Sequence, residues 1–242
     1  MENTRFKVGE EKKVKEILEE ESEAWHNKRS ELYELSHGQI KYFYASSVFQ
    51  CPRKIWYEFK GGRPKFSSIT CRIFHNGEAV HERLCTYLRN SKKVKLQEEV
   101  PIESIIIGDT TIHGRIDGWI TFIDTNKDHL LEFKSINAES LLRPKIEHVA
   151  QLNLYMGASS VKTGSVVYES KRNNQIFEFE VDFNQELYDD SISFFRGVKE
   201  HIDEDIIPVV DYKHNKYPCS WRNFAGKCPH YDKCWGKGIK RT

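Results

Sequence analysis

The sequence predicts a single α/β (α+β) domain in which a mixed central β-sheet is flanked by helices. The main observation is the order of the periodic segments: helical patterns, three strand-like runs, a helix, two strands and a closing helix. The composition agrees with this class, since 38% hydrophobic and 30% charged residues in a chain of 242 are typical of a globular domain. The chain contains no internal repeat and no low-complexity segment.

The N-terminal part is expected to be helical. We predict a charged helix over residues 7–36, within an arm at 1–40, where apolar positions are sparse. A short helix is expected within 46–59. Residues 72–90 predict a stronger helix because their apolar residues recur at three- and four-residue spacing.

The middle of the chain is expected to supply the sheet. The runs KLQEEVPI, TIHGRIDGWITFI and HLLEFKSI have strand-like composition and are separated by turn-forming residues. A helix over 145–158, two strands joined by the polar hairpin KRNN, and a helix over 184–204 complete the pattern. We therefore place the core at 41–204 and a cysteine-rich basic tail at 205–242.

The chain lacks the features of a membrane or secreted protein. No stretch approaches the roughly 18 consecutive apolar residues of a membrane helix, and the charged N-terminus differs from a secretory signal. We expect a cytoplasmic protein with no membrane partner. The net charge is only +1, but residues 212–242 carry eight Lys and Arg against the single acid Asp232. Such a tail can follow phosphates or simply act as a solvated surface.

Three charged residues in the strand region form the central candidate site. Glu132 and Lys134 lie two residues apart in an apolar strand, so they project from one face, while Asp117 lies on the preceding strand. Two carboxylates can hold Mg²⁺ or Mn²⁺, and a lysine can neutralise charge on a phosphate. A surface Glu–Lys pair is the alternative interpretation, but charges in so apolar a strand favour a function.

Further ligands of such a cation could come from outside these two strands. His81 lies on the apolar face of the helix predicted at 72–90, where a histidine is usually a satisfied core residue. Glu98 or Glu99, in the first strand, is either an additional ligand or merely exposed.

Four short motifs in order resemble the RecB-like branch of the PD-(D/E)XK nuclease superfamily. They are GxxxH (Gly77 to His81), GxxD (Gly114 to Asp117), E-x-K (Glu132 to Lys134) and QxxxY (Gln151 to Tyr155). The superfamily proline before the aspartate is Ile116 in this chain.

The resemblance implies a restriction-endonuclease-like core and a DNA exonuclease acting on single strands or ends. It implies that His81, Asp117 and Glu132 bind metal and that Asp117, Glu132 and Lys134 are catalytic. It also places Gln151 and Tyr155 beside the site, where they contact DNA or orient the lysine.

The cysteines form a second candidate site. Cys219, Cys228 and Cys234 lie close together in the tail and need a fourth ligand, for which Cys51 is the best candidate. His230 could instead complete a local zinc site. Cys71 and Cys85 fit a helix core better.

The cysteine contexts also resemble a family, the CRISPR-associated (Cas-four type) RecB-like exonucleases. That resemblance implies a [4Fe–4S] cluster, with Zn²⁺ as the alternative, and CRISPR integration proteins as partners. Eight residues separate Cys219 from Cys228, where those relatives have two. A phage or plasmid recombination or repair nuclease, a non-catalytic DNA-binding subunit and a zinc-stabilised structural protein remain alternatives.

Overall fold

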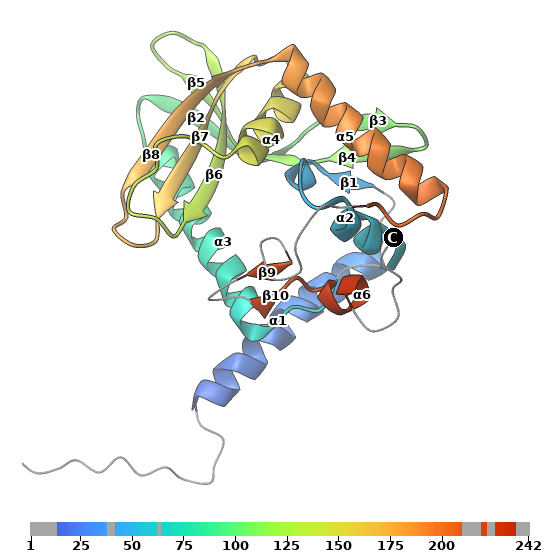
Figure 1. The fold of residues 1–242 in the computed structure, drawn as a ribbon. Helices are drawn as coiled ribbons and strands as arrows, with labels where there is room; N and C mark the ends of the chain where they lie inside the picture. The colour runs from blue at the N-terminus through green and yellow to red at the C-terminus, as the bar shows by residue number, and fades with distance from the viewer. Residues whose placement is uncertain (1–13, 38–41, 62–63, 210–218, 222–225, 236–242) are drawn as a thin grey trace, which may run out of the picture.

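A five-stranded mixed sheet lies at the centre of the computed structural model, which describes all residues except 1–13, 38–41, 62–63, 210–218, 222–225 and 236–242 (Figure 1). In sheet order the strands are β2 (Val94–Pro101), β5 (Arg115–Phe122), β6 (Asp128–Ile136), β7 (Thr163–Ser170) and β8 (Ile176–Asp182). Neighbours are antiparallel except β6 and β7, which are parallel and are connected through a helix. The sheet confirms the predicted fold class.

Helices α3 (Ser68–Arg89) and α4 (Ile146–Gly157) pack on opposite faces of this sheet. Helix α1 (Val14–His37) packs on α3, and α2 (Pro52–Gly61) packs on α5 (Gln185–Asp203). Side chains that alternate along β6 enter different cores: Leu131 and Phe133 pack with Val80 of α3, whereas Leu130 packs in the larger core that contains Leu152 of α4. The alternation therefore places Glu132 and Lys134 on the α4 face.

A second, three-stranded sheet adjoins the first. It contains β1 (Phe43–Tyr44), which is followed by a 3₁₀ turn (Ala45–Ser47), and β3 (Ile105–Ile107) and β4 (Thr110–His113), with β4 in the centre. The run predicted as one strand at 111–123 is thus two strands, divided at Gly114. A Cβ on Gly114 would lie 2.5 Å from Cε1 of Tyr155, so this close approach of β4–β5 to α4 requires glycine.

The two terminal segments pack on helices of the core. The N–H of Ser68 in α3 donates to Oε1 of Glu23 in α1 at 2.6 Å. The tail contains β9 (Ser220–Trp221), β10 (Gly226–Lys227) and α6 (Tyr231–Trp235). Tyr57 of α2 donates its hydroxyl to the carbonyl of Lys233 at 3.3 Å and stacks on His230. Among the described helices, none is both long and apolar enough to cross a membrane.

Candidate metal centre

Glu99 and Asp117 face each other across β2 and β5. The pairs Glu98–Gly118 and Val100–Ile116 flank them, so the register places the two acids opposite one another. Glu99 has a φ of 52°, a left-handed conformation that is rare for a residue with a side chain. The strands bend at this point: Ile116 lies in the larger core and Ile120 in the smaller, although strict alternation would put both on one face.

The Asp117 carboxylate also fills a gap in the sheet. The β5–β6 ladder ends at the pair of Gly118 and Leu131. Beyond it, the N–H of Phe133 donates to Oδ2 of Asp117 at 2.7 Å. This bond satisfies a buried backbone donor and fixes the carboxylate against the strand that carries Glu132.

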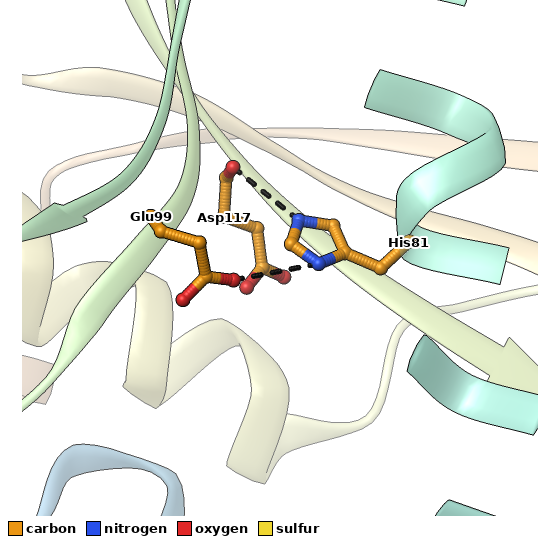
Figure 2. Close-up of side chains that lie close together, drawn as sticks. All are labelled: His81, Glu99 and Asp117. Atoms are coloured by element: carbon orange, nitrogen blue, oxygen red, sulfur yellow. Dashed lines mark hydrogen bonds and ion pairs between the residues drawn. The ribbon is translucent and has the colours of Figure 1, made fainter. Parts of the chain in front are cut away.

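His81 of α3 completes a group of three potential metal ligands with Glu99 and Asp117 (Figure 2). One ligand atom from each lies within 4.8 Å of the other two. The ring Nδ1 of His81 is 3.4 Å from Oε1 of Glu99, and Nε2 is 3.4 Å from the carbonyl oxygen of Asp117. The sequence had left Glu98 and Glu99 as equal alternatives; Glu98 instead pairs with Arg89 on the surface, at 2.7 Å.

Glu132 lies opposite Asp117 on β6 and is almost completely buried, with 1% of its surface exposed. Its Oε1 accepts a hydrogen bond from Nζ of Lys134, whereas its Oε2 has no hydrogen-bond partner among the residues that the structure describes. A buried carboxylate oxygen without a donor is unfavourable unless a cation or another donor meets it. Three carboxylates, those of Asp117, Glu132 and Glu99, and the imidazole of His81 are therefore a set of ligands that fits a divalent cation.

The pKa values in this cluster reflect the crowding of acids. Burial raises the pKa of Glu132 to about 8, and the adjacent charge of Asp117 contributes to the rise. Burial also raises the pKa of Asp117, although the charge of Lys134 opposes it. For Lys134 burial lowers the pKa, but the carboxylates outweigh it and the pKa is raised. The lysine therefore stays charged, and a bound cation would favour ionisation of both acids.

Gln151 and Tyr155 are buried rather than surface residues of α4. Nε2 of Gln151 donates to the hydroxyl of Tyr155 at 2.7 Å. The Tyr155 ring packs against Gly114, just before β5, and burial together with the charge of Glu132 raises its pKa. The structure thus places this pair next to the carboxylates, where it supports the bend that carries Asp117.

Tyr168 and His148 lie near Lys134 and were not predicted from the sequence. Tyr168 of β7 is paired with Lys134 in the sheet register. Its hydroxyl accepts from the N–H of Lys145 at 3.0 Å and lies 2.8 Å from Nδ1 of His148. No motif or spacing marked these residues, because their proximity to the lysine depends on the parallel pairing of β6 with β7.

The four predicted cysteine ligands lie in one region, beside α2 and in the tail, but among the described residues they form no metal-ligand group, and a shared site stays a prediction. Burial raises the pKa of Cys51 and of Cys228, and each thiol is close enough to Cys219 for its charge to contribute. Burial likewise raises the pKa of Cys234 to about 11, with contributions from Cys51 and Cys228. The N–H of Cys228 donates to the carbonyl of Cys219 at 3.0 Å.

The other candidate ligands of the cysteine site lie in different surroundings. His230 is buried against Tyr57, and its Nε2 is 3.8 Å from Oε1 of Glu58. Cys71 and Cys85 are completely buried within α3, as core thiols.

Comparison with known proteins gives matches only among solved structures. No family model matches the chain, and no curated protein matches its sequence. The crystal structure of SSO0001 is 22% identical, covers 80% of this chain and 87% of its own, and has a TM-score of 0.52. The alkaline exonuclease LHK-Exo from Laribacter hongkongensis is 14% identical, with coverages of 76% and 95% and a TM-score of 0.48. LHK-Exo in complex with dAMP is 14% identical, with coverages of 69% and 92% and a TM-score of 0.42. At these identities the comparisons bear on the fold, which this chain shares with SSO0001.

Proposed function

We propose that the protein is a metal-dependent DNA nuclease that hydrolyses phosphodiester bonds, acting as an exonuclease on single strands or ends. The observation that carries this proposal is the convergence of His81, Glu99 and Asp117 next to the buried Glu132 and its ion-pair partner Lys134. Glu132 is buried beside Asp117, and adjacent carboxylates in the interior are costly unless a cation balances their charge.

The proposed ligands are His81, Glu99, Asp117 and Glu132. A divalent cation bound by them would polarise the scissile phosphate and lower the pKa of an attacking water molecule. Lys134 would neutralise charge that develops on the phosphate, and its contact with Glu132 holds the ammonium group on the same side as the carboxylates. Gln151 and Tyr155 would act indirectly, by holding the segment around Gly114 in place.

We propose further that Cys51, Cys219, Cys228 and Cys234 bind a [4Fe–4S] cluster, with Zn²⁺ as the alternative. The hydrogen bond from the N–H of Cys228 to the carbonyl of Cys219, together with the placement of Cys51 and Cys234 in the same region, supports a common site. Such a group would tie α2 to the tail across most of the length of the chain and stabilise the fold without taking part in cleavage.

The proposed nuclease is tested by cleavage of end-labelled single- and double-stranded DNA in Mn²⁺, Mg²⁺ or EDTA. We expect metal-dependent cleavage that Asp117→Ala and Lys134→Ala abolish. Lys95→Ala, at an exposed lysine of β2, is the matched control and should retain cleavage. A folded wild type that binds DNA but does not cut it would contradict the proposal and favour a non-catalytic DNA-binding subunit.

The biological setting that we propose is CRISPR adaptation, with integration proteins as partners, on the basis of the sequence resemblance. The alternative is a phage or plasmid recombination or repair nuclease. Trimming of spacer-precursor overhangs should be enhanced by CRISPR integration proteins in the first case. No enhancement, with cleavage of recombination intermediates instead, would favour the second.

A further inference from the structure

A cavity of about 240 Å³ lies outside the carboxylate cluster, where α1, α2, α3 and β1 meet. Its walls are largely aromatic and include His26 of α1, Tyr42, Tyr44, Phe66 and Phe74. All five rings are half-buried rather than buried. A concave space that is open to solvent and lined mainly by aromatic side chains is the usual form of a small-ligand site.

The rings form two groups of neighbours. In the first, Phe66 and Phe74 meet edge to face with centroids 5.1 Å apart, and His26 lies 5.3 Å from Phe74. In the second, Tyr42 and Tyr44 also meet edge to face, at 5.2 Å. Cavities for drug-sized ligands are usually about 300–1,000 Å³, so this smaller space fits a single planar group in contact with aromatic rings.

The cavity is close to the carboxylate cluster along the chain. The Tyr42 ring stacks on His113, with centroids 4.4 Å apart and an interplanar angle of 28°. His113 ends β4, and Asp117 follows four residues later, so the two Cα atoms are at most about 14 Å apart. A few nucleotides can span this distance, because even the stacked nucleotides of a duplex rise about 3.4 Å each.

A carboxylate also lines the cavity. Glu58 of α2 is the one acid among the described residues that line it. Its Oε1 is 3.6 Å from Nζ of Lys54 and 3.8 Å from Nε2 of His230. A carboxylate oxygen can accept a hydrogen bond from the amino group of cytosine, adenine or guanine, which thymine lacks.

We propose that this cavity binds one unpaired base of single-stranded DNA, at a fixed distance from the carboxylate cluster. Aromatic faces stack on bases of any sequence, whereas Glu58 favours a base with an amino group. The site would hold the strand while the phosphodiester bond is cut elsewhere. The inference rests on the proposed nuclease function for its substrate class.

The test uses short single-stranded oligonucleotides that each carry 2-aminopurine at one position, with the full-length, anaerobically purified protein in EDTA. We expect the 2-aminopurine fluorescence to be quenched at one position, where the base stacks in the cavity. Tyr44→Leu and Phe66→Leu should remove this quenching and weaken binding roughly 5- to 100-fold. Tyr44→Phe keeps the ring and should retain both.

A second experiment tests whether Glu58 accepts a hydrogen bond from the bound base. With wild type, an oligonucleotide that has cytosine at the quenched position should bind more tightly than one with thymine, and Glu58→Gln should remove this preference. Equal affinities for the two oligonucleotides in wild type would overturn the role of Glu58.

The design separates this inference from the nuclease proposal. Asp117→Ala lies outside the cavity and should keep the quenching although it loses cleavage. Quenching that is unchanged in both leucine variants, or absent at every position with wild type, would overturn the base-binding site even if the protein cleaves DNA. Quenching without cleavage by wild type would instead overturn only the nuclease function.

Discussion

The neutral histidine beside the candidate site makes the stability of the protein depend on pH. Burial, together with the positive charges of Lys134 and Lys145, lowers the pKa of His148 to about 3. In the unfolded chain a histidine has a pKa of about 6.5, so below that pH the unfolded state binds a proton that the native state does not. The contribution of neutral His148 to the free energy of unfolding is therefore fully present above pH 6.5, and it is lost progressively as the pH falls towards 3.

The size of this effect follows from proton linkage. At pH 5 the protonation of one unfolded histidine lowers the free energy of unfolding by about 2 kcal/mol relative to pH 7.5. Because His148 is half-buried, solvent screening reduces the expected loss to roughly 1–2 kcal/mol. His148→Asn is the informative variant, because its side-chain amide can still bond to the hydroxyl of Tyr168 but does not titrate.

The assay is urea unfolding of wild type and His148→Asn at pH 7.5 and pH 5, followed by tryptophan fluorescence. Other titrating groups contribute equally to both proteins and cancel in the difference. We expect the stability of wild type relative to the variant to fall by roughly 1–2 kcal/mol between the two pH values. Parallel pH dependences would refute the reasoning that His148 is neutral in the folded protein.

Three further predictions concern the bend, the metal ligands and the cysteines. Gly114→Ala should destabilise the protein by about 1–3 kcal/mol in urea unfolding, because its Cβ would meet the buried Tyr155 ring at 2.5 Å; an unchanged midpoint would contradict the close approach. Glu99→Gln should weaken Mn²⁺ binding at least tenfold in calorimetry whereas Glu98→Gln should not, and equal losses would remove the distinction between these neighbours. Cys51→Ser should lower the bound iron, or zinc, and the melting temperature together, as metal analysis and thermal unfolding would reveal; a full metal content would exclude Cys51 as a ligand.

The helices and strands could be predicted because the periodicity of apolar residues is a local property of the sequence. The helical periodicity of 72–90 and 145–158 corresponds to α3 (Ser68–Arg89) and α4 (Ile146–Gly157), and the strand at HLLEFKSI corresponds to β6 (Asp128–Ile136). The division of the strand predicted at 111–123 was missed. This division depends on the close approach of Gly114 to the Tyr155 ring of α4, and the pattern of residues within 111–123 does not reveal a contact with another element.

The burial of α4 shows a similar limit. The sequence predicted the helix at 145–158 but not that residues Ala150 to Met156 are all buried, which follows because other elements enclose the helix. Gln151 and Tyr155 therefore bond to each other in the interior.

The sequence by itself determined the mixed α/β class and the common face of Glu132 and Lys134, because strand alternation sets the direction of side chains two residues apart. It also predicted that Cys51, Cys219, Cys228 and Cys234 bind one metal or cluster, which stays a prediction. Only the tertiary structure decided that Glu99, rather than Glu98, joins His81 and Asp117, since that choice depends on a left-handed residue at a bend between two strands. Distances between residues remote in the chain are set by packing, and no local pattern encodes them.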